Sequence, residues 1–325
     1  MTKRWSVLLF SLVKAAITIA LIVVIITKID FSALARHLDG SGAAYLLLGT
    51  LVLALNIFIV ALRWWLLLRR LDVESVSLGY ATAGTYASIF VGQATPGPIG
   101  ADAVRGWLCY RRHVKLRLIV MSLLTDRLLG MLALIVVAGA VWYWLFDAGR
   151  ETLGQEIAVL AALAVAAGAA ALWLLPALMG NLAKRWGKLR ALHELLTMFR
   201  FTAVSGAGVL GMALSCVVVA LTVNAVLLFA RGFGVPLAPS VGYLIVPVAV
   251  LLSTLPISIG GWGVREASLS YGLALFGVAP ADAALLGLAL GMGLLFASLP
   301  GGIVLLLIGG QIRPMLRNAG SEAAE

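Results

Sequence analysis

Two short stretches decide the fold of this chain: TPGPIGADAVRG at residues 95–106 and LPISIGGWGVREA at residues 255–267. Each places proline and glycine inside an apolar segment, where they stop a helix, and each then continues into a new helical pattern. The stretches align without a gap at a spacing of 160 residues, with identical residues at Pro96 and Pro256, Ile99 and Ile259, Gly100 and Gly260, Val104 and Val264, and Arg105 and Arg265.

The same shift brings the other apolar runs of the first half onto apolar runs of the second half. Short matches of Gly, Ala and Val also arise by chance, but this wider agreement favours an internal repeat. We assign residues 1–156 to the first half and residues 157–312 to the second. Repeats with interrupted helices at matching positions are typical of transporters, and the interruptions mark the binding site.

Composition places the chain in a membrane, because 62% of its residues are hydrophobic and only 12% are charged. The net charge of +10 comes from Lys and Arg between apolar runs, which indicates membrane orientation and anionic headgroups and gives no reason to expect nucleic acid as a partner. The polar connections are too short for a soluble domain, so we expect one membrane domain over residues 1–325. Spans of ~20 residues fit six apolar runs, at residues 6–27, 43–62, 118–146, 157–178, 204–230 and 283–309.

We therefore predict an all-α integral membrane protein, a helical bundle of about six full spans plus two re-entrant hairpins at residues 77–116 and 237–278. Basic residues at Arg63–Arg70 and Arg111–Arg117 flank the first hairpin and place both of its ends in the cytoplasm. Because three spans per half is an odd number, the halves form an inverted repeat. We expect a bacterial or archaeal plasma (inner) membrane, with the N-terminus and the tail at 313–325 both cytoplasmic.

The hairpin tips are the predicted binding site. Pro96, Pro98 and Pro256 break the helices, and a helix that restarts after them presents unpaired N–H groups and a partial positive charge to an anion. We expect Arg105 and Arg265 to lie in the first turn of these half-helices, where a cation is unfavourable unless an anion binds. Phosphate fits, because a guanidinium engages two of its oxygens. The predicted residues for a lipid headgroup are Arg105, Arg265, Gly100, Gly260 and Gly261.

Four further charges are expected to support this site: Asp102, Asp126, Arg127 and Glu266. Asp102 lies three residues before Arg105, so an internal ion pair between them is an alternative to anion binding. Glu266 is expected to face away from Arg265. Asp126 and Arg127 interrupt an apolar span and are expected to bind other partners rather than each other. Asp126 either holds Arg105 or Arg63 in place or contacts the ligand directly.

The remaining reactive and aromatic residues suggest no chemistry. Cys109 and Cys216 are isolated and predict helix packing, not a metal site, and no cofactor motif is present. No nucleophile and base have the spacing of a known catalytic motif, so we do not expect an enzyme. The aromatic groups at 63–65 (RWW) and 142–144 (WYW) are typical of interfacial belts.

Three ordered motifs resemble the flippase-like proteins related to the transmembrane region of lysylphosphatidylglycerol synthase. They are P-x-x-x-G-x-D-x-x-R from Pro96 to Arg105, the pair Asp126–Arg127, and P-x-x-x-G-G-x-G-x-R-E from Pro256 to Glu266. The resemblance covers nearly the whole chain and implies lipid translocation, in that synthase of aminoacylated phosphatidylglycerol and elsewhere of polyprenyl- or hopanoid-linked lipids. The synthase carries a soluble transferase domain after its membrane region, whereas this sequence ends at RNAGSEAAE, so we expect the transport part alone.

Two functions are therefore predicted. The first is a flippase-like lipid translocase that moves an anionic phospholipid or a polyprenyl- or hopanoid-type lipid between leaflets. The alternative is a non-transporting membrane scaffold that presents lipid to a partner glycosyltransferase or acyltransferase. Lipids with anionic headgroups are the expected partners in both, and a lipid-modifying enzyme is a further partner in the second.

Overall fold

The computed structural model describes residues 40–95, 99–147, 205–255 and 257–309, together with residues 193, 196, 197 and 200. These ranges form the helices α3 (Gly40–Arg70), α4 (Leu78–Gly92), α5 (Ile99–Tyr110), α6 (Leu116–Asp147), α9 (Gly206–Gly232), α10 (Pro239–Ser253), α11 (Val264–Ala274) and α12 (Pro280–Gly309). The predicted spans at 6–27 and 157–178 and the tail at 313–325 lie outside the described residues. The all-helical prediction is confirmed for the part of the chain that the structure describes.

Four helices, α3, α6, α9 and α12, are long and apolar enough to cross a bilayer. Their apolar windows have a mean hydropathy between 2.0 and 2.5 and contain at most two charged residues. A helix of 27 residues extends ~40 Å, which exceeds the ~30 Å hydrocarbon layer. Leucines at positions 47, 51 and 55 form an exposed stripe along α3, as a lipid-facing surface requires. The chain is therefore a multi-pass membrane protein.

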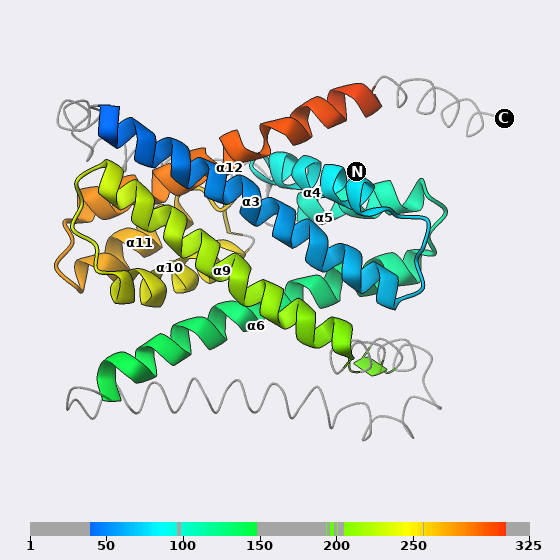
Figure 1. Cartoon of the computed structure of the whole chain (residues 1–325), viewed down its shortest axis with the longest axis horizontal. Coiled ribbons are helices and arrows are strands. Elements are labelled where there is room, and N and C mark those ends of the chain that lie inside the picture. The colour runs from blue at the N-terminus through cyan, green and yellow to red at the C-terminus, as the bar shows by residue number, and fades with distance from the viewer. Residues whose placement is uncertain are drawn as a thin grey trace, which may run out of the picture.

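Helices α3 and α9 form the central pair of the bundle and cross its middle side by side (Figure 1). The Asn56 amide of α3 donates to the Val218 carbonyl at 2.7 Å and to Thr222 Oγ1 at 3.0 Å, both on α9. Gly49 allows close approach, because a Cβ there would contact the Phe229 ring. Small residues and interhelical hydrogen bonds thus hold this pair together, as expected for helices in lipid.

The short helices form two pairs, α4 with α5 and α10 with α11, at opposite ends of the bundle (Figure 1). Helix α4 starts just after α3 ends, capped by Ser77, and α5 ends just before α6 starts. The outer ends of the first pair therefore lie together at the Arg70 end. The second pair lies in the same way between the end of α9 and the start of α12.

Each short pair also packs on the long helix that follows the other pair. Helix α4 contacts α12, and α10 contacts α6. The α4–α12 contact depends on Gly301, because a Cβ there would overlap the backbone of Tyr86 and Ala87. These crossed contacts bring the two interrupted stretches together in the middle of the bundle.

Candidate functional site

Both interrupted stretches contain a helix break, as predicted. Helix α4 ends at Gly92 and α5 begins at Ile99, whereas α10 ends at Ser253 and α11 begins at Val264. The predicted breaking residues Pro96, Pro98 and Pro256 lie outside the described residues. The breaks therefore agree with the sequence, while the prolines themselves stay a prediction.

The two breaks touch each other. The Gly260 N–H donates to the Thr95 carbonyl at 2.8 Å, which joins the second break to the first. Gly260 has a φ of 60°, and a Cβ there would collide with the Gln93 carbonyl. Only glycine fits this position, because the left-handed backbone and the close approach both exclude a side chain. Gly100 is restricted too, since a Cβ there would collide with the Thr95 side chain.

A small cavity of about 180 Å³ lies where the breaks meet. Its walls include the predicted headgroup residues Gly260 and Gly261, with Gln93, Ala101, Ser253 and Thr254. The Gln93 Oε1 atom is buried and makes no hydrogen bond within the part of the chain that the structure describes. Neither Arg105 nor Arg265 lines this cavity, so the structure does not bring all predicted headgroup residues to one surface.

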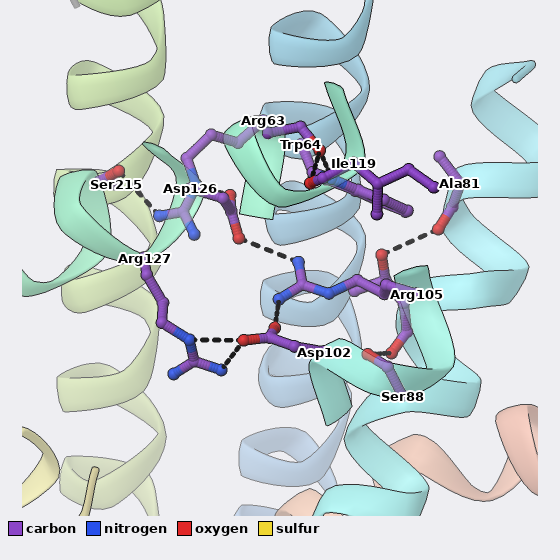
Figure 2. A network of polar contacts seen from close by, with 12 residues as sticks. Arg63, Trp64, Ala81, Ser88, Asp102, Arg105, Ile119, Asp126, Arg127 and Ser215 are labelled. Carbon is purple, nitrogen blue, oxygen red and sulfur yellow. Dashed lines mark hydrogen bonds and ion pairs between the residues drawn. The ribbon is translucent and has the colours of Figure 1, made fainter. Parts of the chain in front are cut away.

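The charges of the first half form a chain of five side chains, which we call the Arg–Asp network: Arg63, Asp126, Arg105, Asp102 and Arg127 (Figure 2). Asp126 accepts from Arg63 Nε at 2.7 Å and from Arg105 Nη1 at 2.9 Å. Asp102 accepts from Arg105 Nη2 at 2.8 Å and from Arg127 Nε at 2.7 Å. Two carboxylates thus face three guanidinium groups.

Burial differs along the Arg–Asp network. The side chains of Arg63, Asp126 and Arg105 are at most 7% exposed, whereas those of Asp102 and Arg127 are 22% and 23% exposed. Desolvation makes a buried charge costly unless its partners are well placed, so the inner three residues depend on each other. The outer two form the accessible end of the network.

Several contacts that the sequence offered as alternatives for Asp102 and Asp126 occur side by side in the Arg–Asp network. The internal pair of Asp102 with Arg105 is present, and Asp126 holds both Arg105 and Arg63. Asp126 and Arg127 bind different partners, as expected from adjacent positions on a helix. The prediction that Arg105 lies in the first turn is wrong: α5 begins at Ile99, and Asp102 is the acidic residue of its first turn. A carboxylate is favourable there because the helix N-terminus is positive.

The aromatic group at 63–65 is not an interfacial belt throughout, which corrects the sequence prediction. Trp64 is 1% exposed, its Nε1 donates to Ser122 Oγ at 3.2 Å, and Arg105 lies over its ring at 5.2 Å. Arg63 is buried as well and donates to Ser215 Oγ of α9 at 2.8 Å. Neither Trp64 nor Ser215 was predicted from the sequence as part of the site. By contrast, Trp144 is 68% exposed, as a belt residue would be.

The second half places its arginine differently, and one prediction there is wrong. Glu266 does not face away: Arg265 Nη2 donates to Glu266 Oε1 at 2.7 Å, and Arg265 Nε donates to the Gly287 carbonyl at 3.2 Å. Glu266 also accepts from the N–H of Gly263, which starts α11 with a φ of 84°. The long arginine side chain folds back over the first turn of α11 to reach its neighbour. The pair is almost fully buried and electrically neutral.

Glycines on α12 create the space for this neutral pair. A Cβ on Gly287 would crowd Glu266, and a Cβ on Gly291 would collide with Arg265 and Trp262. At the positions 160 residues earlier, α6 carries Arg127 and Met131. The chain therefore packs α11 closely on α12, while the corresponding position of α6 carries an arginine that forms an ion pair with α5.

The described ranges contain no cluster of metal ligands. Across residues 40–95, 99–147, 205–255 and 257–309, no group of three or more His, Cys, Asp or Glu side chains is placed to hold a metal ion. Cys109 is fully buried and Cys216 partly buried, both as free thiols. The charged side chains described above can bind a charged group and neutralise it.

Comparison with known proteins links this geometry to a family. The family model described as lysylphosphatidylglycerol synthase TM region matches residues 11–301, which include every described helix from α3 to α11 and most of α12. No curated protein matches the chain.

Proposed function

The chain belongs to the lysylphosphatidylglycerol synthase transmembrane-region family, whose function is linked to membrane lipids, and we propose that it is a flippase-like lipid translocase. Its substrate is an anionic phospholipid or a polyprenyl- or hopanoid-type lipid with an anionic headgroup, which it moves between leaflets. The protein is not itself an enzyme in this proposal. The observation that carries the proposal is the Arg–Asp network itself, a set of charged side chains between the helices α3, α5 and α6 of a membrane bundle.

Such a network is expensive inside a membrane. Three guanidinium groups and two carboxylates lie together there, and three of the five side chains are at most 7% exposed. Charged groups at membrane depth mark substrate and ion pathways, because their cost has to be offset by a function or a partner. A phosphate that reaches the accessible end at Asp102 and Arg127 would accept hydrogen bonds from guanidinium groups, which bind two phosphate oxygens at once. This favours an anionic ligand over a neutral or cationic one.

Arg265 has a different part in this proposal. Its charge is already balanced by Glu266, so the headgroup binds first at the Arg–Asp network. Gly260 and Gly261 line the cavity where the breaks meet and let the headgroup pass between the halves. Arg265 then engages phosphate only when the Glu266 contact opens.

The arrangement of helices supports an inverted repeat with two re-entrant hairpins. A shift of 160 residues carries α3 onto α9, α4 onto α10, α5 near α11 and α6 onto α12. The same shift exchanges the crossed contacts, α4 with α12 and α10 with α6. The hairpins start from opposite ends of the bundle, as inversion requires (Figure 1). Halves of this kind give alternating access by rocking around a central site. The basic residues then place the first hairpin and both termini on the cytoplasmic side of a bacterial or archaeal inner membrane.

Reconstitution in liposomes tests the proposal. Full-length protein is inserted into vesicles with a fluorescent phosphatidylglycerol in both leaflets, and an impermeant quencher is added outside. A translocase exposes the inner-leaflet label and lowers fluorescence toward zero, whereas empty vesicles keep about half of it. Asp126→Asn and Arg127→Gln should slow this step. A folded protein that leaves the inner label protected would contradict translocation and favour the scaffold that presents lipid to a partner enzyme.

A further inference from the structure

A surface groove of about 500 Å³ runs between α5 and α6. Residues of both helices line the groove, and most of them are apolar. The lining includes Asp102, Gly106 and Tyr110 on α5, and Leu116, Ile119 and Leu123 on α6. Tyr110 and Leu116 are each 67% exposed, so the outer end is open at the surface.

The inner end of the groove is the accessible end of the Arg–Asp network. Along α5, Asp102, Gly106 and Tyr110 are spaced four residues apart, so they lie on one face. Along α6, Ile119 and Leu123 continue at the same spacing to Arg127. The ion pair of Asp102 with Arg127, at 2.6 Å between Nη2 and Oδ2, therefore closes the groove at its inner end.

The groove has the depth of one leaflet. Eight residues of helix from Tyr110 to Asp102 extend ~12 Å. Half of the ~30 Å hydrocarbon layer is ~15 Å. With the loop between α5 and α6 at the membrane surface, the Asp102–Arg127 pair lies near the bilayer middle.

The outer end of the groove is strongly basic. The residues that follow Tyr110 include Arg111, Arg112, Lys115 and Arg117. Arg111 lies over the ring of Trp107, another wall residue, at 5.2 Å, which holds its charge at the groove. Basic residues at a membrane surface attract anionic headgroups. The apolar length and the basic mouth together match the two parts of an anionic phospholipid.

The second half lacks this combination. Helix α11 packs on α12 through Gly287 and Gly291, and the two helices contact each other more extensively than α5 and α6 do. The loop from α11 to α12, at residues 275–279, reads LFGVA and is followed by Asp282 in the first turn of α12. No basic residue lies within that loop. The loops that follow α5 and α11 therefore differ in charge.

We infer that the groove between α5 and α6 is the docking site for an anionic phospholipid from the leaflet on the basic side. One acyl chain lies along Gly106 and Ile119, and the phosphate lies at the basic loop beside Arg111. The headgroup then reaches the Asp102–Arg127 pair by moving along the groove. The inference rests on the proposed function for that last step, and it makes loading one-sided, since the described loop between α11 and α12 carries no basic residue.

Photocrosslinking tests the docking site without measuring transport. The full chain is placed in nanodiscs that contain a phosphatidylglycerol with a diazirine in one acyl chain, and labelled peptides are identified after irradiation. Labels are expected on residues 102–123 and not on residues 264–291. A phosphatidylcholine with the same diazirine chain should label the groove severalfold less, because its headgroup has no net charge.

Variants decide between docking and general lipid contact. Ala103 is an exposed wall residue, so Ala103→Phe fills the groove without entering the core and should lower labelling at least fivefold. Val120→Trp fills it from the opposite wall with the same result. Val136→Phe adds an aromatic ring to the exposed surface of α6 beyond the groove and should leave labelling unchanged. Arg111→Gln with Lys115→Gln should remove the preference for phosphatidylglycerol, at about fivefold for each charge.

Three results would overturn the docking site: equal labelling by the two lipids, labelling that survives both filling variants, or equal labelling of α11 and α12. The liposome assay separates this outcome from failure of the proposed function. Groove labelling without translocation would contradict the translocase and leave the docking site standing. Translocation without specific groove labelling would support the translocase and contradict the docking site.

Discussion

Asp126 is the residue on which the stability of the first half most depends. Its two oxygens bind Arg63 and Arg105 at 2.7 and 2.9 Å, and it is 2% exposed. In Asp126→Asn the amide replaces one acceptor with a donor that faces a guanidinium, and two buried arginines lose their shared counter-charge. Removing one partner of a buried ion pair costs ~3–5 kcal/mol. We expect the free energy of unfolding to fall by about that amount.

The assay is a double-mutant cycle in detergent, with unfolding by a denaturing detergent followed by tryptophan fluorescence. Arg63→Gln alone should also destabilise, because it leaves Asp126 with one partner. The double variant restores the original net charge of the network and should be less destabilised than the sum of the single variants. A coupling energy of ~1–3 kcal/mol is expected for residues in one network.

A matched control comes from the accessible end of the same network. Arg127→Gln leaves Asp102 its ion pair with Arg105, so it strands no carboxylate and should cost less than Asp126→Asn. Additive effects of Asp126→Asn and Arg63→Gln, with coupling below ~0.5 kcal/mol, would refute the view that the network is a cooperative buried unit. Equal losses in Arg127→Gln and Asp126→Asn would refute the assigned order of burial.

Three further predictions concern the second half and the topology. Arg265→Ala should lower the melting temperature in detergent because it strands the buried Glu266 carboxylate, and adding Glu266→Gln should restore most of it; no rescue would contradict the neutral pair. Gly291→Leu should cost at least ~2 kcal/mol, since its side chain would collide with Arg265 and force α11 away from α12, and an unchanged melting curve would show that this contact is not tight. Single cysteines at Arg70 and Lys115, in a background without native cysteines, should both be protected from an impermeant thiol reagent outside the cell, and labelling of either would contradict the first hairpin.

The long helices were predictable because their signal is local. Each requires ~20 apolar residues. The runs at 43–62, 118–146 and 283–309 lie within α3, α6 and α12, and the run at 204–230 overlaps α9. The exact ends depend on local caps. Ser205, for example, caps α9 by accepting from the Gly208 N–H. The helix breaks were equally predictable, because proline and glycine act on their own neighbours.

The partners inside the site were less predictable because they depend on helix rotation. Arg63 reaches Asp126 across 63 residues of sequence and Ser215 across 152. Nothing in an apolar run fixes which of its faces turns inward, so the sequence could propose Asp126 as a partner for Arg63 or Arg105 but not choose. The burial of Trp64 was missed for the same reason. An aromatic residue beside arginines has the same local pattern at an interface as in the core.

The contact between Arg265 and Glu266 was not predicted because it depends on the backbone conformation at the start of α11. Residues one position apart on a helix normally point about 100° apart, which predicted that Glu266 would avoid Arg265. The prediction left out the reach of the arginine side chain and the start of α11 at Gly263. Because Gly263 has a left-handed backbone, its N–H turns toward Glu266 and holds the carboxylate over the first turn. Arg265 then meets it there.

The differences between the halves carry more information about function than their likeness. The shift of 160 residues aligns Arg127 with Gly287 and Met131 with Gly291, so a single helix position changes from a charge to a glycine. The glycine side closes on a neutral pair, and the arginine side keeps an ion pair at the end of an open groove. A device that returned lipid equally in both directions would have no need of this asymmetry. The proposed one-sided loading gives it a physical reason, because the loop after α5 is basic and attracts anionic lipid, whereas the loop after α11 carries no basic residue.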